Sequence, residues 1–229
     1  MELYLIRHTT PDVVRGTCYG QSDIPASSGF LKEAGIIRSH LPSKIGKVYS
    51  SPLRRCSQLA EYLFPSHAIH LDSNLMEIHC GDWEMRLWDE IPRTELDPWM
   101  NNFVEFSMPG GESYQQLYSR VLSCFEEILR HSESSAIITH GGVIRSILSH
   151  ITETPLEQSF QKFSLHYGCV VKLSAENDRL IPEWIFNNPP DEKEMHKPGS
   201  FSACYLKGIL FPHARGLACR IIHLLIYIC

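Results

Sequence analysis

Residues 135–151 read SAIITHGGVIRSILSHI, and this stretch indicates the fold class most directly. Ser135 to Thr139 is a short apolar run of the kind that forms a buried strand, and Val143 to Ile151 continues with helical spacing. His140 and two glycines lie between the two segments. A buried strand that leads directly into a helix is the repeating unit of α/β proteins with a parallel sheet.

The same alternation recurs through the first 186 residues. Strands are expected at 2–6, 47–50, 68–71, 135–139, 169–173 and 181–185, and helices at 30–41, 51–63, 112–130 and 143–151. Residues 9–29, rich in Thr, Pro, Gly and Ser, are expected to form a loop. We therefore predict a three-layer α/β/α sandwich with a mostly parallel central sheet. Residues 80–112, with their tryptophans and prolines, are expected to form a helical cap insertion.

The composition is that of an ordinary soluble globular protein. The 229 residues are 43% hydrophobic and 21% charged, so the chain can bury a core without disulfide or metal staples. A formal net charge of −5 gives no electrostatic reason to expect nucleic acid as a partner. The amino terminus lacks the basic region of a signal peptide, and the eight cysteines include no CxxC pair. We therefore expect a cytoplasmic protein with reduced thiols and no metal site.

The carboxyl-terminal residues have a different character. Asn187 to Lys197 is polar with paired prolines, and the apolar stretch that follows Leu206 is interrupted by Arg215 and Arg220. The run after Arg220 is too short to span a bilayer. We therefore expect one domain over 1–186, a tail of unassigned role over 187–229 and no membrane span. Edge strands or the tail could support a homodimer.

Four cationic or titratable residues fall where a ligand site is expected. Arg7 and His8 follow the first strand, Arg55 lies in the helix after the second, and His140 ends a central strand. In open α/β sheets, ligands bind beyond the carboxyl ends of the strands. The planar fork of arginine suits phosphate, and Gly141, in the turn after His140, would add a backbone donor at a helix start. The pattern predicts a phosphate pocket.

Five motifs, in this order along the chain, resemble those of the histidine phosphatase superfamily in its phosphoglycerate mutase-like branch. They are LIRH at 5–8, SSPLRRC at 50–56, LMEIHCGDWE at 75–84, PGGES at 109–113 and THGG at 139–142. The motifs span most of residues 1–186, and together they are highly specific. The resemblance implies an α/β fold and a phosphatase that needs neither metal nor cofactor and takes a small phosphomonoester.

The resemblance also implies a role for each pocket residue. His8 matches the nucleophilic histidine, Arg7 and Arg55 the arginines that grip phosphate, His140 the second pocket histidine and Glu77 the carboxyl acid/base. These roles are chemically consistent. His8 must attack as a neutral imidazole, with one ring nitrogen donating to a backbone carbonyl. Glu77 would protonate the leaving oxygen and then activate water.

The residues after His8 depart from the family pattern. The family places a glycine there, whereas this chain has Thr9-Thr10-Pro11, so the loop is expected to follow a different path. RHTTPDV, with GTCYGQSD at 16–23, is similar to the α-ribazole phosphatases of cobalamin assembly, which act on α-ribazole 5′-phosphate. This likeness implies that Tyr19, Gly20 and Asp23 line the substrate entrance. Alternatively, they only shape a loop.

Three other functions stay open at this stage. A broad-specificity phosphatase would share every catalytic motif. A phosphoglycerate mutase would normally keep the missing glycine. A non-catalytic phospho-ligand binding module would normally have lost catalytic residues, and none is lost here. Outside the pocket, Trp83 and Glu84 are expected to brace the cap, Glu112 and Ser113 to start a helix, and Arg145 to be structural or on a helix surface.

Overall fold

A computed structural model describes residues 1–131, 133–177 and 179–188. Its six-stranded sheet has the order β4-β3-β6-β1-β7-β8. The strands are β1 (Glu2–Arg7), β3 (Lys47–Ser50), β4 (Ile69–Leu71), β6 (Ser135–Thr139), β7 (Val170–Glu176) and β8 (Arg179–Phe186). The first four strands in that order run parallel, and β7 and β8 pair antiparallel to their neighbours. The predicted α/β fold with a mostly parallel sheet is confirmed. The expected tail lies almost entirely outside the described residues.

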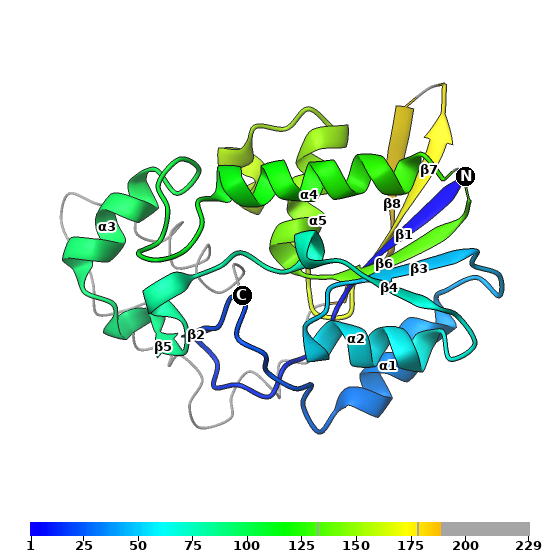
Figure 1. Ribbon diagram of the computed structural model, residues 1–229, viewed down its shortest axis with the longest axis horizontal. Helices are drawn as coiled ribbons and strands as arrows, with labels where there is room; N and C mark the ends of the chain where they lie inside the picture. The colour runs from blue at the N-terminus through cyan, green and yellow to red at the C-terminus, as the bar shows by residue number, and fades with distance from the viewer. Residues whose placement is uncertain (132, 178, 189–229) are drawn as a thin grey trace.

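Helices cover both faces of the sheet, as Figure 1 shows. On one side lie α1 (Phe30–Ser39) and α2 (Arg54–Leu63), and on the other α4 (Tyr114–Leu129) and α5 (Gly141–Ile151). The side chains of a strand alternate between the two faces of the sheet, so β1 contributes residues to the hydrophobic core on each face. Leu3 and Leu5 pack into the core that includes α4 and α5, and Tyr4 and Ile6 into the core that includes α1 and α2.

The cap lies between β4 and α4 in the chain. Its elements are η1 (Ser73–Leu75), η2 (Gly81–Trp83), β5 (Arg86–Leu87), η3 (Trp88–Glu90) and α3 (Arg93–Asn101). Trp83, Trp88 and Trp99 form its centre, with ring centroids 5.5 to 6.2 Å apart. Figure 1 shows α3 and β5 on the side of the molecule opposite the amino terminus, and β1 runs from the amino terminus toward that side. The cap therefore stands beside the carboxyl edge of the sheet.

Three of the expectations that the structure corrects concern segments near the site. The region 9–29 is not entirely loop, because β2 (Thr17–Cys18) pairs antiparallel with β5 of the cap. The helix expected from 51 begins at Arg54, since Leu53 is extended and its N–H donates to the Ser51 hydroxyl at 3.3 Å. The helix expected from 112 begins at Tyr114, where Ser113 is the capping residue.

No helix among the described residues has both the length and the apolar character needed to cross a bilayer.

Candidate active site

Neighbouring strands bring the predicted residues together at the carboxyl edge of the sheet. β1 and β6 pair in register with Arg7 opposite Thr139, so His8 and His140 both emerge one residue later. The N–H of His8 donates to the Thr139 carbonyl at 2.9 Å, and the two histidine rings lie 5.2 Å apart. All five residues predicted for catalysis are almost fully buried: Arg7, His8, Arg55, Glu77 and His140.

His8 has the tautomer that nucleophilic attack requires. Its Nδ1 lies 2.7 Å from the Thr9 carbonyl oxygen, and because a carbonyl can only accept, Nδ1 carries the proton. The lone pair is then on Nε2. Burial, followed by the charges of Arg55 and Arg7, holds the pKa of His8 well below its usual value. The imidazole is therefore neutral at pH 7.

His140 is also held neutral. Burial, followed by Arg55 and His8, lowers the pKa of His140 well below its usual value. Its Nε2 lies 2.8 Å from the Ser51 hydroxyl, which belongs to the segment between β3 and α2. A neutral imidazole can give or accept one hydrogen bond at each nitrogen. His140 can therefore donate to a bound anion only when its single ring proton is on the nitrogen that faces the anion.

Backbone carbonyls hold the two arginines in place. Arg7 donates from Nη1 to the Leu165 carbonyl at 2.6 Å. Arg55 donates from Nη1 to Ser22 at 2.8 Å and from Nη2 to Gly20 at 2.7 Å. Among the described residues, the buried Nε of each arginine has no hydrogen-bond partner. Leaving a buried donor unsatisfied is costly, and a phosphate oxygen would satisfy both.

Backbone N–H groups orient the carboxylate of Glu77. Oε1 accepts from Ile78 at 2.9 Å, and Oε2 accepts from Gly142 in the first turn of α5 at 3.1 Å. A Cβ on Gly142 would clash with Oε1, so any larger residue there would displace the Glu77 carboxylate. A Cβ on Gly141 would meet the Arg7 guanidinium carbon at 3.2 Å. The two glycines thus let α5 approach both the acid and the arginine.

The three residues predicted at the substrate entrance are placed differently from one another. The Tyr19 ring lies 5.1 Å from the Arg55 guanidinium, and the Gly20 carbonyl accepts from Arg55. Gly20 has a positive φ of 37°, and a Cβ would meet the Ile78 carbonyl at 2.7 Å. Asp23 instead accepts from the Arg54 N–H at 2.7 Å, at the exposed start of α2. Tyr19 and Gly20 therefore contact Arg55 directly, whereas Asp23 contacts only the start of α2, the helix that contains Arg55.

Sequence reasoning missed Tyr167, which is part of the pocket wall. Its ring lies 4.2 Å from the Arg7 guanidinium carbon and 5.5 Å from the His8 ring, and its hydroxyl bonds to that of Tyr19 at 3.0 Å. Tyr167 precedes β7, which runs antiparallel to β1. Because the two strands run in opposite directions, the start of β7 lies beside the carboxyl end of β1. A prediction of the direction of β7 could therefore have identified Tyr167 as a site residue.

Arg145 does not lie on a helix surface. It is fully buried in α5, donates from Nε to the Phe163 carbonyl at 3.2 Å and packs on the Phe160 ring at 4.6 Å. Burial lowers the pKa of Arg145 to about 10, so it stays charged at pH 7. In the part of the chain that the structure describes, the buried arginines and carboxyl groups are then Arg7, Arg55, Arg145 and Glu77. The three guanidiniums outnumber the single carboxyl group, and this excess of positive charge suits the dianion of a phosphomonoester.

No three His, Cys, Asp or Glu side chains of the described residues gather closely enough to hold a metal ion.

Comparisons with known proteins show which family this chain resembles over most of its described length. A family model described as the histidine phosphatase superfamily (branch 1) matches residues 3–188. A Hydrogenobacter thermophilus protein with the name "Putative phosphoserine phosphatase 2" is 29% identical over 78% of this chain and 93% of its own. The metal-independent phosphoserine phosphatase of Arabidopsis thaliana is 30% identical over 66% of this chain and 69% of its own.

Solved structures show the same fold. The α-ribazole phosphatase of Shigella flexneri superposes with a TM-score of 0.73 over 82% of this chain and 96% of its own. The two sequences are 22% identical, so this likeness bears on the fold and not on the substrate.

Proposed function

Because this chain belongs to the histidine phosphatase superfamily, branch 1, we propose that it hydrolyses phosphomonoesters through a phosphohistidine formed on His8. The observation that carries the proposal is the hydrogen bond from His8 Nδ1 to the Thr9 carbonyl. It leaves the lone pair on Nε2, in a buried pocket shared with Arg7, Arg55 and His140. The named relatives include phosphatases, which supports the same reaction type.

The first step transfers the phosphoryl group to the enzyme. His8 Nε2 attacks phosphorus and forms an N–P bond, while the bond from phosphorus to the ester oxygen breaks. Glu77 gives its proton to the departing oxygen, which leaves as an alcohol. Arg7 and Arg55 can each donate from Nε to the phosphoryl oxygens, where charge accumulates.

The second step releases phosphate. Glu77, now a carboxylate, takes a proton from a water molecule as that water attacks phosphorus, and the N–P bond breaks with its electron pair returning to His8. The buried guanidiniums supply the positive charge that Mg²⁺ supplies in kinases. We therefore propose that catalysis needs no metal ion. The Arabidopsis relative, which is named metal-independent, supports this.

The preferred substrate that we propose is α-ribazole 5′-phosphate. The support is the segment GTCYGQSD at 16–23, in which Tyr19 packs on Arg55 and Gly20 accepts from it. A second candidate is phosphoserine, because the names of the two relatives described above both include phosphoserine phosphatase. A broad-specificity phosphatase remains the alternative if neither ester is preferred. The cobalamin role, the cytoplasmic location and a homodimer stay predictions.

The experiment is phosphate release, with EDTA present, from α-ribazole 5′-phosphate, phosphoserine and an aryl phosphate. We expect turnover in EDTA, a higher kcat/KM for α-ribazole 5′-phosphate, and no turnover by His8→Ala. The matched control is His131→Ala, at an exposed histidine outside the site. Preference for phosphoserine would replace the substrate but keep the chemistry. Full activity of His8→Ala, or loss of wild-type activity in EDTA, would contradict the mechanism.

A further inference from the structure

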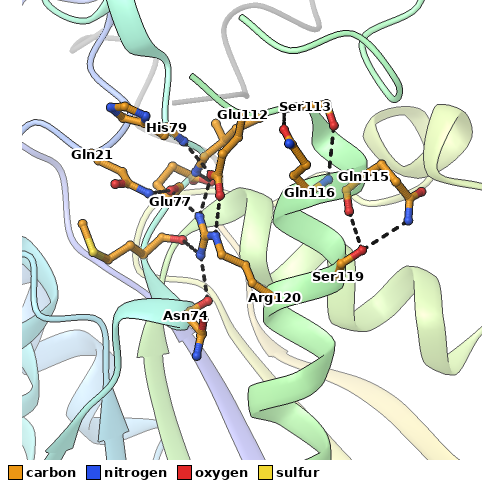
Figure 2. Close-up of polar contacts among 12 residues, drawn as sticks. Gln21, Asn74, Glu77, His79, Glu112, Ser113, Gln115, Gln116, Ser119 and Arg120 are labelled. Atoms are coloured by element: carbon orange, nitrogen blue, oxygen red, sulfur yellow. Dashed lines mark hydrogen bonds and ion pairs between the residues drawn. The ribbon is translucent and has the colours of Figure 1, made fainter. Parts of the chain in front are cut away.

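Arg120 of α4 is not one of the predicted catalytic residues, but it forms hydrogen bonds to the segment that contains Glu77 (Figure 2). Its Nη1 donates to the carbonyls of Asn74 and Met76, each at 2.8 Å. Its Nη2 donates to the carbonyl of Glu77 itself, also at 2.8 Å. One guanidinium therefore fixes three backbone oxygens within four consecutive residues, and the last belongs to the proposed acid.

Glu112 orients that guanidinium. Its Oε1 accepts from Arg120 Nε at 2.8 Å and its Oε2 from Nη2 at 2.9 Å, a fork-to-fork pairing that fixes the plane of the guanidinium. Oε2 also accepts from the N–H of His79 at 2.9 Å. Glu112 and Arg120 together thus hold the chain on both sides of Glu77. Glu112 directly precedes Ser113, which caps α4, the helix that carries Arg120.

Gln21 adds a second side-chain donor to the same carbonyl. Its Nε2 donates to the Glu77 carbonyl oxygen at 2.9 Å, and Figure 2 shows the Gln21 side chain beside Glu77. The main chain of Glu77 is therefore fixed by Arg120 and Gln21, and its carboxylate by Ile78 and Gly142.

The Arg120–Glu112 ion pair differs from an ordinary surface pair. Its side chains are 18% and 21% exposed, against 69% and 54% for Arg93–Asp97 on α3. Exposed pairs contribute little to stability, whereas a largely buried, fully hydrogen-bonded arginine is held in one geometry. General-acid catalysis needs the acid within hydrogen-bond reach of the leaving oxygen, so a small displacement is costly.

We propose that Arg120, oriented by Glu112, is a positioning residue for proton transfer by Glu77. The inference rests on the proposed function, since it assumes that Glu77 protonates the leaving group. Arg120→Lys keeps the charge but replaces the planar fork with a single ammonium, which cannot serve three carbonyls and two carboxylate oxygens at once. The carboxyl of Glu77 would remain, but its position would be less well defined.

The test compares two leaving groups. Phenyl phosphate releases a poor leaving group that needs the proton of Glu77, whereas 2,4-dinitrophenyl phosphate releases an anion that needs none. We expect Glu77→Gln to lower kcat/KM for phenyl phosphate by about 10²-fold or more and to affect the dinitrophenyl ester far less. Arg120→Lys should show the same selectivity, with a loss of about tenfold on phenyl phosphate. Arg93→Lys, the matched control, should change neither rate.

The outcomes separate the inference from the function on which it rests. Equal losses on both esters for Arg120→Lys, with Glu77→Gln selective, would overturn the positioning role. If Glu77→Gln itself showed no selectivity, the acid role of Glu77 would be wrong, and the role of Arg120 with it. If Arg120→Lys did not fold by circular dichroism, Gln21→Met and Glu112→Gln would take its place. If these variants lost activity on phenyl phosphate but not on 2,4-dinitrophenyl phosphate, the inference would be supported. Equal losses on the two esters would overturn it.

Discussion

The Nδ1–H of His8 donates to the carbonyl oxygen of the next residue, Thr9, at 2.7 Å. A backbone group therefore fixes the tautomer of the nucleophile, and the side chain at position 9 takes no part in that bond. Thr9 is also not among the described residues with positive φ, so its backbone conformation does not require glycine. This explains how the chain keeps the site geometry with Thr9-Thr10-Pro11 in place of the family's glycine.

Thr9→Gly should therefore leave catalysis nearly unchanged. We expect kcat/KM within about threefold of wild type and a free energy of unfolding lower by about 1 kcal/mol, because glycine gains more freedom in the unfolded chain. Steady-state kinetics and urea unfolding measure the two effects. Thr10→Gly is the control, because it introduces the same extra freedom into the unfolded chain at the neighbouring position. A hundredfold loss of kcat/KM for Thr9→Gly alone would mean that the Thr9 side chain takes part in the reaction.

Arg55→Lys should lower kcat/KM by about 10²-fold, because an ammonium group cannot donate to the Gly20 and Ser22 carbonyls and to phosphate in the same geometry. The control is Arg54→Lys at the neighbouring, exposed arginine, which should be active. The comparison uses kcat/KM on one aryl phosphate. Equal activity of the two variants would show that only the positive charge at position 55 matters, and not the planar shape of the guanidinium.

Acid should destabilise the protein through His8 and His140. The pKa of each is lowered in the folded state, chiefly by burial, so below about pH 6.5 the unfolded chain takes up protons that the folded chain does not. Their contribution to stability is full above that pH. It falls below it, by at most about 1.4 kcal/mol per pH unit for each histidine.

Urea unfolding at pH 7.5 and pH 5.5 measures this effect. His8→Asn should lose less stability between the two pH values than wild type, whereas exposed His131→Asn should lose as much as wild type. Because His8 also helps to lower the pKa of His140, the difference reports His8 together with its effect on His140. An unchanged pH dependence in His8→Asn would contradict the lowered pKa.

Tyr167 should contribute through its ring more than through its hydroxyl. The ring packs on the Arg7 guanidinium at 4.2 Å, and the hydroxyl forms a hydrogen bond with the Tyr19 hydroxyl at 3.0 Å. We expect Tyr167→Ala to lower kcat/KM about tenfold and Tyr167→Phe to stay within about threefold. The measurement is kcat/KM on an aryl phosphate. Equal losses in the two variants would instead show that the bond between the two hydroxyls matters.

The parts of the site that could be predicted from sequence are those that follow strands directly. Arg7, His8 and His140 could be placed because parallel neighbours end at one edge, and Arg55 because it starts the helix after such a strand. The sandwich fold followed from the same alternation. The motif match that pointed to Glu77 did not show what positions its carboxylate.

The parts that could not be predicted depend on contacts between distant segments. Tyr167 reaches the pocket because β7 runs antiparallel, a direction that the spacing of apolar residues does not reveal. Arg120 meets the carbonyl of Glu77 only because α4 packs against the segment that follows β4. For Arg145 the sequence left a structural role and a helix-surface position open, because a charged residue in a helix is usually exposed, whereas here α5 is buried on nearly all sides.

The central claim is that phosphate passes through His8, and direct detection of the phosphoenzyme tests it. Wild type and Glu77→Gln, whose dephosphorylation should be slow, are mixed with radiolabelled phosphomonoester and quenched in alkali, where phosphohistidine survives. We predict label on the His8 peptide in both, removed by acid, and none in His8→Asn although His140 is still present. Turnover by wild type without any labelled enzyme, or label that persists in His8→Asn, would contradict the account.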